Sequence, residues 1–165
     1  FGNGSAMRVS PCGYLNSLED ALKQAEASAI CSHDHPEGIR GAQIVAHSIW
    51  ALRHGATKSD ILQVAEDTYG YSVKNLRVEE LQRSNHFDET CQGTIPPALC
   101  CLLESTDFED AIRNAISIGG DSDTIGAIVG GIAEAHYGIP EAIRQQALTY
   151  LPDEMLTIIK QFQEL

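Results

Sequence analysis

The sequence has no long apolar run, few basic residues and few aromatic ones. No stretch approaches the roughly 20 consecutive apolar residues of a membrane-spanning helix, and the first residues lack a signal-peptide pattern. Eleven basic residues stand against 23 acidic ones, which gives a formal net charge of −12. A surface that binds nucleic-acid phosphates needs clustered lysine and arginine, so this balance argues against such a partner. We therefore expect a soluble, cytoplasmic protein that binds neither nucleic acid nor membrane.

The cysteines form no metal or disulfide pattern, and common catalytic motifs are missing. The five thiols are odd in number, include no C-x-x-C pair and mostly have apolar neighbours. Cys91 lies beside acidic residues, which would not activate it as a nucleophile. No G-x-S-x-G turn, Walker loop or Rossmann motif is present. We expect reduced, buried thiols at Cys12, Cys31, Cys91, Cys100 and Cys101.

Strand-like alternation is also missing, and the apolar spacing is helical almost throughout. Residues 84–94 are polar and contain glycine, so we expect a loop there. No repeat or linker interrupts the chain, so residues 1–165 are expected to form one all-α domain, a compact bundle. The expected helices are 17–30 (capped by Ser17), 36–54 (Pro36 in the first turn), 59–69 (capped by Ser59), one with Pro96 and Pro97 in its first turn, 106–118 (a capping box of Thr106 and Glu109, ended by Gly119 and Gly120), 124–137 (ended by Gly138), and two short helices started by Pro140 and Pro152.

The most specific motif is the sequence GGDSDT at residues 119–124, which leads into an apolar helix. Asp121 and Asp123 lie two residues apart and Thr124 follows, so this turn supplies the hard oxygen donors that magnesium, manganese and calcium prefer. Aspartate and serine also stabilise helix N-termini without any metal. The spacing alone leaves both interpretations open.

Small residues line one side of the helix that follows this motif. Each interior glycine costs up to about 1 kcal/mol relative to alanine, so the small side indicates close approach of another segment. Such packing would place the GGDSDT turn deep in the bundle, and a buried carboxylate pair would favour a bound cation. The small residues are Gly126, Ala127, Gly130 and Gly131.

Two further motifs contain candidate binding residues. In FGNGSAMR (residues 1–8) the glycines allow backbone N–H groups to face an anion, and the Asn3 and Ser5 side chains could add donors. An ordinary turn, with Arg8 in a structural ion pair, is the alternative. His33 and His35 precede a helix, but no further histidine or cysteine has the spacing of a zinc site.

In this order, the motifs GNGSAMR, SHDHPEG, CQGTIP and GGDSDTIGAIVGGIAEAHYG resemble those of the ADP-ribosylglycohydrolase family, which includes the dinitrogenase reductase activating glycohydrolase. The resemblance spans essentially the whole chain. It implies a compact orthogonal helical bundle around a two-magnesium centre, with manganese as an alternative metal. It also implies hydrolysis of the glycosidic bond between ADP-ribose and a protein side chain or small acceptor.

The resemblance also assigns roles to individual residues. Asp121, Asp123 and Thr124 match metal ligands, and Phe1 matches an aromatic residue that stacks on adenine. The residues that match the contacts to the rest of ADP-ribose are Gly2, Asn3, Gly4 and His33.

One departure from the family pattern affects these expectations. No part of the sequence matches the family's N-terminal Thr-Asp-Asp metal motif or its acidic acid–base residue, so the catalytic residue in this chain is unknown. We therefore expect the chain to be the C-terminal part of such an enzyme, with a weak, incomplete metal site, doubtful activity alone and an N-terminal fragment of the same protein as a candidate partner. The alternative is a non-catalytic ADP-ribose-binding or structural protein with the same fold.

Overall fold

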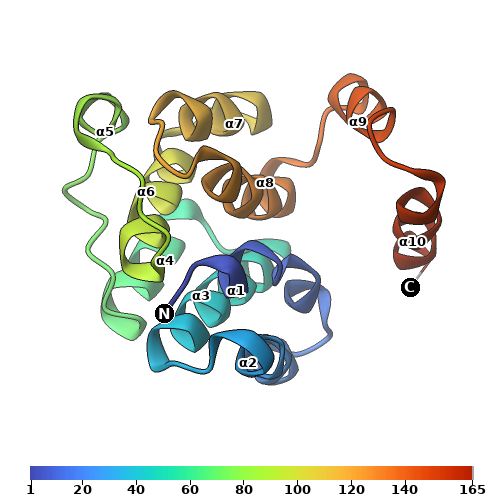
Figure 1. The fold of residues 1–165 in the computed structure, drawn as a ribbon, viewed down its shortest axis with the longest axis horizontal. Helices are drawn as coiled ribbons and strands as arrows, with labels where there is room; N and C mark the ends of the chain where they lie inside the picture. Colours follow the sequence, from blue (N-terminus) through green and yellow to red (C-terminus); the bar gives the residue numbers. More distant parts are fainter. Residues whose placement is uncertain (165) are drawn as a thin grey trace.

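The computed structural model describes residues 1–164, and its regular structure is helical, as predicted (Figure 1). Within this range the one β pairing is an isolated antiparallel bridge between Gly2 and Thr90. The helices in chain order are α1 (Gly4–Met7), the 3-10 helix η1 (Ser10–Tyr14), α2 (Leu18–His33), α3 (Pro36–Arg53), α4 (Lys58–Gln63), the π-helical turn η2 (Val64–Thr68), α5 (Val78–Ser84), α6 (Cys91–Glu104), α7 (Phe108–Ser117), α8 (Ser122–Tyr137), α9 (Glu141–Leu148) and α10 (Asp153–Gln163).

The hydrophobic core lies around α3 and α8. Helix α3 packs against α1, α2, η1 and α8, while α8 also packs against α6 and α7 (Figure 1). Ile44 and Ile49 of α3 and Ile128 and Ile132 of α8 are fully buried. Burying one such side chain contributes about 1.5–3 kcal/mol, so these isoleucines stabilise the packing of α3 and α8 in the core.

Several predicted helix ends are confirmed. The Ser17 side chain accepts a hydrogen bond from the backbone N–H of Asp20 at the start of α2. After α7 the chain turns through Gly119 and Gly120, whose φ angles are +68° and +70°. Gly138 ends α8 with a φ angle of +71°. Glycine adopts such angles without the steric cost of other residues, so these positions end the helices.

Two predicted N-caps are wrong. Thr57, not Ser59, caps α4, and its side chain and that of Asp60 form a reciprocal capping box. Asp107, not Thr106, caps α7 by accepting from the backbone N–H of Asp110. Both segments contain several cap-forming residues in a row, and the one with an extended backbone just before the first helical turn makes the bond.

The start of α6 also differs from the prediction. The helix begins at Cys91 and is capped by Thr90, so the predicted loop is shorter and the prolines lie inside the helix instead of in its first turn. Pro96 and Pro97 have no N–H, which removes the hydrogen bonds that they would donate to Gln92 and Gly93. The Thr90 Oγ1 accepts from the Gly93 N–H at 3.1 Å and so satisfies one of the unpaired N–H groups at the start of the helix.

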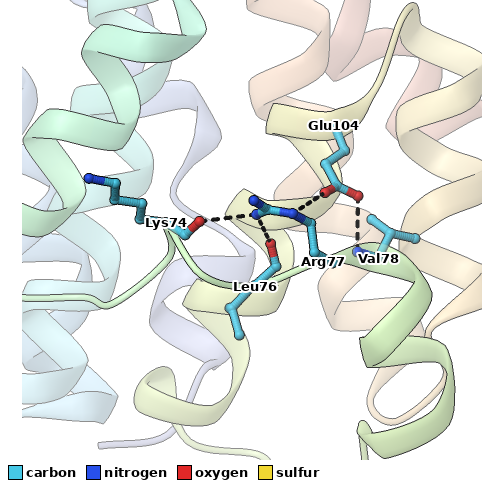
Figure 2. Close-up of polar contacts among 5 residues, drawn as sticks. All are labelled: Lys74, Leu76, Arg77, Val78 and Glu104. Atoms are coloured by element: carbon cyan, nitrogen blue, oxygen red, sulfur yellow. Dashed lines mark hydrogen bonds and ion pairs between the residues drawn. The ribbon is translucent and has the colours of Figure 1, made fainter.

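Helix α5 had no counterpart in the sequence analysis because its cap comes from another helix. Figure 2 shows Glu104, at the end of α6, accepting a hydrogen bond from the Val78 N–H at 3.0 Å. The other Glu104 oxygen lies 3.7 Å from Arg77 Nε. The Arg77 guanidinium also donates to the carbonyls of Lys74 at 3.0 Å and Leu76 at 2.6 Å. These bonds tie the 72–77 loop and α5 to α6.

Helices α9 and α10 lie to one side of the bundle (Figure 1). Neither contains a buried residue. A single aromatic contact links α10 to η1, with the rings of Phe162 and Tyr14 edge to face at 5.5 Å between centroids. None of the helices in residues 1–164 is long and apolar enough to span a bilayer.

Candidate functional site

The glycine-rich turn at the start of the chain lies alongside the segment that leads into α6. The backbone N–H of Asn3 donates to the Glu89 carbonyl at 2.8 Å, and the N–H of Cys91 donates to the Phe1 carbonyl at 2.9 Å. These two bonds flank the bridge between Gly2 and Thr90. Two of the sequence motifs, FGNGSAMR and CQGTIP, are therefore in contact.

Asn3 connects the same turn to the GGDSDT motif. Its side-chain nitrogen donates to Asp121 Oδ2 at 2.7 Å and to Thr94 Oγ1 at 2.9 Å. Asn3 is 7% exposed; its bond to Thr94 is buried and its bond to Asp121 is partly buried. An amide NH₂ has two donors, and here both are used. Asn3 thus fixes the Asp121 carboxylate beside the glycine-rich turn.

The three predicted metal ligands occupy the N-terminal turn of α8 with different exposures. Asp121 is half-buried, Asp123 is exposed and Thr124 is buried. The Thr124 hydroxyl lies 3.6 Å from Met7 Sδ, a weak hydrogen bond. The expectation that the whole turn lies deep in the bundle is wrong for Asp123, because the small side of α8 packs one or two turns further along the helix.

The predicted close contacts of that small side are found at Gly130 and Gly131, whereas Ala127 is exposed. A Cβ atom added at Gly131 would overlap the side chain of Ser10 in η1. At Gly130 it would lie 3.3 Å from Ile112 Cδ1, and at Gly126 3.7 Å from Ile116 Cδ1. The absence of a side chain at Gly131 therefore lets η1 pack directly against α8.

His33 lies against the glycine-rich turn. Its Nε2 is 2.9 Å from the place where a Cβ would stand on Gly4 and 3.3 Å from that on Gly2, so a side chain would overlap the imidazole ring at Gly4 and be tightly packed against it at Gly2. Phe1 is 59% exposed and packs its ring edge to face with His35 at 5.0 Å between centroids. The structure therefore brings all the predicted substrate-contacting residues together.

Side chains expected to donate to a ligand instead hold the turn. Both Asn3 donors are engaged by Thr94 and Asp121, and the Ser5 hydroxyl donates to the Gly38 carbonyl at 2.8 Å. Both residues are buried. The turn therefore offers a ligand its backbone and the adjacent His33 instead of the Asn3 and Ser5 side chains.

The thiols and His35 have structural roles. Cys91 is buried, which raises the pKa of its thiol to about 11, and the protonated thiol donates to the Gly2 carbonyl at 3.3 Å. The His35 imidazole accepts from the Glu37 N–H at 3.1 Å and caps α3. Cys100 and Cys101 are also buried, but Cys12 is half-buried and Cys31 is exposed, so the expectation of buried thiols is wrong for these two.

Sequence reasoning missed the side chains that surround Asn3. Thr94 accepts from Asn3 and donates to the Asp88 carbonyl at 3.1 Å. The Asp88 carboxylate accepts from the Thr90 N–H at 2.8 Å, and hydrogen bonding to Thr90 lowers the pKa of Asp88. The only signal in the sequence was the position of Thr94 in CQGTIP, which gave no indication of its partner.

The predicted ligands fit only part of a magnesium shell. Carboxylate and hydroxyl oxygens suit magnesium or manganese. Within residues 1–164, however, no three His, Cys, Asp or Glu side chains lie close enough together to hold a metal ion. Asp121, Asp123 and Thr124 could therefore occupy some coordination positions, and the others would belong to water or to groups outside this range.

Comparison with known proteins gives a consistent assignment. The ADP-ribosylglycohydrolase family model matches residues 1–165. Human ADP-ribosylhydrolase ARH3 is 28% identical to this chain, and the alignment covers 94% of the chain and 56% of the human protein. ADP-ribosylarginine hydrolase Tri1 of Pseudomonas putida is 25% identical, over 84% of the chain and 39% of that protein.

A solved structure agrees with the sequence comparisons. An ADP-ribosylglycohydrolase-related protein complex matches with a TM-score of 0.67 and 27% identity, over 84% of this chain and 52% of the other. The chain spans about half the length of the curated relatives it matches. The family match over the full sequence, the shared fold and the contact between the glycine-rich turn and the GGDSDT motif together show that this chain belongs to the ADP-ribosylglycohydrolase family.

Proposed function

We propose that this chain is the C-terminal part of a metal-dependent ADP-ribosylhydrolase, which cleaves the glycosidic bond between ADP-ribose and a protein side chain or small acceptor. One observation carries the proposal: Asn3 joins the glycine-rich turn to Asp121 through a bond of 2.7 Å. The segment suited to a nucleotide and the carboxylates suited to a cation therefore lie at one place. The names of the human and bacterial relatives, both hydrolases of ADP-ribosyl groups, support this assignment.

Different residues of this chain would bind different parts of ADP-ribose. Phe1 is exposed and can stack on an adenine ring, while Gly2 and Gly4 carry no side chains of their own, so a diphosphate can approach their backbone. His33 stands beside that backbone as a polar contact. This arrangement would hold the nucleotide end of the substrate and direct its ribose toward Asp121.

Asp121, Asp123 and Thr124 would hold magnesium or manganese. A bound metal would orient the ribose hydroxyls and a water molecule, and it would also stabilise the charge that develops as the glycosidic bond breaks. Asn3 keeps the Asp121 carboxylate in place through its hydrogen bond, and Met7 contacts the Thr124 hydroxyl. No general acid or base is assigned to a residue of this chain.

A non-catalytic ADP-ribose-binding protein is the second candidate. It is favoured by the incomplete ligand set, since residues 1–164 contain no group of three acidic, histidine or cysteine side chains at metal-binding distance. Such a protein would bind ADP-ribose without requiring a metal and would release no product.

The test compares binding and turnover. Calorimetry measures ADP-ribose binding to this chain with and without magnesium, and a release assay measures turnover by the longest protein that the gene encodes. For a hydrolase, Asp121→Asn and Asp123→Asn in that longer protein should abolish magnesium-dependent release while leaving the helical circular dichroism unchanged. Normal turnover by either variant would overturn the metal assignment, and binding without any release would favour the second candidate.

A further inference from the structure

Arg8, the last residue of the GNGSAMR motif, binds the C-terminal turn of α2. Its Nη2 donates to the Ser28 carbonyl at 2.5 Å and to the Ser32 hydroxyl at 2.6 Å, and its Nε lies 3.5 Å from the Ser28 hydroxyl. A guanidinium only donates hydrogen bonds. The Ser32 oxygen must therefore act as the acceptor in its bond with Arg8.

The same Ser32 hydroxyl lies 2.8 Å from Nδ1 of His33. A serine hydroxyl has one hydrogen and two lone pairs, and Arg8 uses one lone pair, so the hydrogen is available to the imidazole. The neighbouring cation polarises the hydroxyl and makes it a better donor. The Arg8 cation also creates a positive potential at Nδ1 of His33, which favours a lone pair there over an N–H group.

His33 has the protonation state that this arrangement requires. Two causes lower the pKa of His33 below the ordinary value: the larger is its burial, and the second is the charge of Arg8. The imidazole is then neutral at neutral pH and carries its proton on only one nitrogen. A lone pair on Nδ1 places that proton on Nε2.

The Nε2 atom of His33 faces the glycine-rich turn, within 3.3 Å of the Cβ positions of Gly2 and Gly4. We propose that Arg8 and Ser32 are positioning residues that hold His33 in the tautomer with the proton on Nε2, so that this nitrogen offers a neutral N–H donor to an oxygen of bound ADP-ribose. The role of His33 as a donor to ADP-ribose rests on the proposed function. The tautomer of His33 does not depend on that function.

The choice of tautomer decides whether His33 attracts or repels the ligand. The diphosphate oxygens of ADP-ribose present only lone pairs, which accept from an Nε2–H group. With the proton on Nδ1, Nε2 would present its own lone pair to these oxygens, and the contact would be repulsive. Ser32 therefore acts through His33, without touching the ligand itself.

Nitrogen-15 NMR of the free, labelled protein above pH 7 tests the tautomer directly. Long-range correlations identify the protonated nitrogen of each of the six histidines, and the variant His33→Gln assigns the His33 signals by their loss. We expect the proton on Nε2 in the wild-type protein. A proton mainly on Nδ1 would overturn the proposal.

Two serines of α2 provide a matched pair of variants. Ser32→Ala removes the hydroxyl that touches His33, and Ser28→Ala removes one that contacts Arg8 alone, while both leave the Ser28 carbonyl in place. We expect mixed His33 tautomers in Ser32→Ala, the wild-type pattern in Ser28→Ala, and restoration of that pattern in Ser32→Thr. An unchanged His33 spectrum in Ser32→Ala would refute the role of Ser32.

Calorimetry with ADP-ribose separates this proposal from the proposed function. The loss of one net hydrogen bond corresponds to an increase in Kd of about two- to tenfold, which we expect for Ser32→Ala but not for Ser28→Ala or Ser32→Thr. If the wild-type chain does not bind ADP-ribose, the proposed function fails and the NMR result still decides the tautomer. If Ser32→Ala changes the tautomer but binds equally well, the donor role of Nε2 is wrong.

Discussion

Asn3 is the residue on which the geometry of the site depends most directly. Its amide donates to Thr94 Oγ1 and to Asp121 Oδ2 at once, and both Asn3 and Thr94 are buried. Asn3→Ala would leave the buried Thr94 hydroxyl without this donor and would remove the bond that holds the Asp121 carboxylate. We expect a loss of about 1–3 kcal/mol in the free energy of unfolding, measured by urea denaturation.

Asn16→Ala is the matched control for this prediction, because Asn16 is exposed. Exposed substitutions away from such contacts usually change stability by less than about 0.5 kcal/mol. Equal losses in the two variants would contradict the role given to Asn3.

His47 makes the stability of the protein dependent on pH. Its Nδ1 lies 3.1 Å from the hydroxyl of Tyr69; burial lowers the pKa of His47 and raises that of Tyr69 to about 12, so the tyrosine donates and the neutral imidazole accepts. The unfolded chain, where His47 has its ordinary pKa of about 6.5, binds the proton more readily. Stability contributed by the neutral ring is therefore present above this pH and lost as the pH falls below it.

The measurement compares urea midpoints at about pH 7.5 and about pH 5.5 in the wild-type protein and in His47→Gln. Glutamine can accept the Tyr69 hydrogen bond but does not titrate. We expect a smaller loss of stability on acidification in the variant. The same loss in both proteins would assign the pH dependence to other groups.

At the scale of elements, the contact between α8 and η1 depends on the absence of a side chain at Gly131. A Cβ there would overlap Ser10, whereas one at Gly126 would lie at an ordinary distance of 3.7 Å from Ile116. Alanine is favoured over glycine in a helix by up to about 1 kcal/mol. We expect Gly131→Ala to lower the thermal midpoint and Gly126→Ala to maintain or raise it, as measured by circular dichroism. Similar shifts in the two variants would show that helix propensity alone determines the change in thermal midpoint.

The helices that could be predicted are those that contain their own end signals. Helix α2 has Ser17 at its start, and α8 ends at Gly138, so local residues define both limits. Helix α5 takes its cap from Glu104 of another helix, which no local pattern can reveal. Cap-rich segments such as 57–60 contain several suitable residues, and only the backbone conformation selects one.

The members of the candidate site were predictable, but the use of each side chain was not. The motifs identified Asn3, His33 and Asp121, and the structure places them around one turn. Asn3 was expected to face a ligand and instead binds two residues of its own chain, because both partners lie far away in the sequence. A polar residue beside glycines fits either role, and only tertiary contacts distinguish them.

At the scale of the whole molecule, the C-terminal helix α10 is peripheral. It contains no buried residue, although Leu156 and Ile159 are half-buried, and the ring of Phe162 contacts that of Tyr14 in η1. An aromatic pair of this kind contributes about 0.5–1.5 kcal/mol. We expect a chain that ends at Leu151 to unfold cooperatively with a free energy reduced by no more than about this amount, measured by urea denaturation.

Phe162→Ala in the full chain removes the same aromatic contact. It should reproduce most of the loss in the free energy of unfolding that the truncation causes. A truncated chain that lacks a cooperative transition would show that α10 supports the bundle in a way that burial does not indicate.

The bond between Asn3 and Asp121 spans 118 positions of the chain, which has a consequence for biosynthesis. At translation rates of about 5–20 residues per second, its two ends leave the ribosome roughly 6–24 s apart. Throughout that interval the glycine-rich turn has no carboxylate to hold it. A nascent chain that stops before α8 would still contain the partners of the turn at Gly38 and Thr94, but the candidate site, which includes Asp121, would be complete only after the start of α8 had been made.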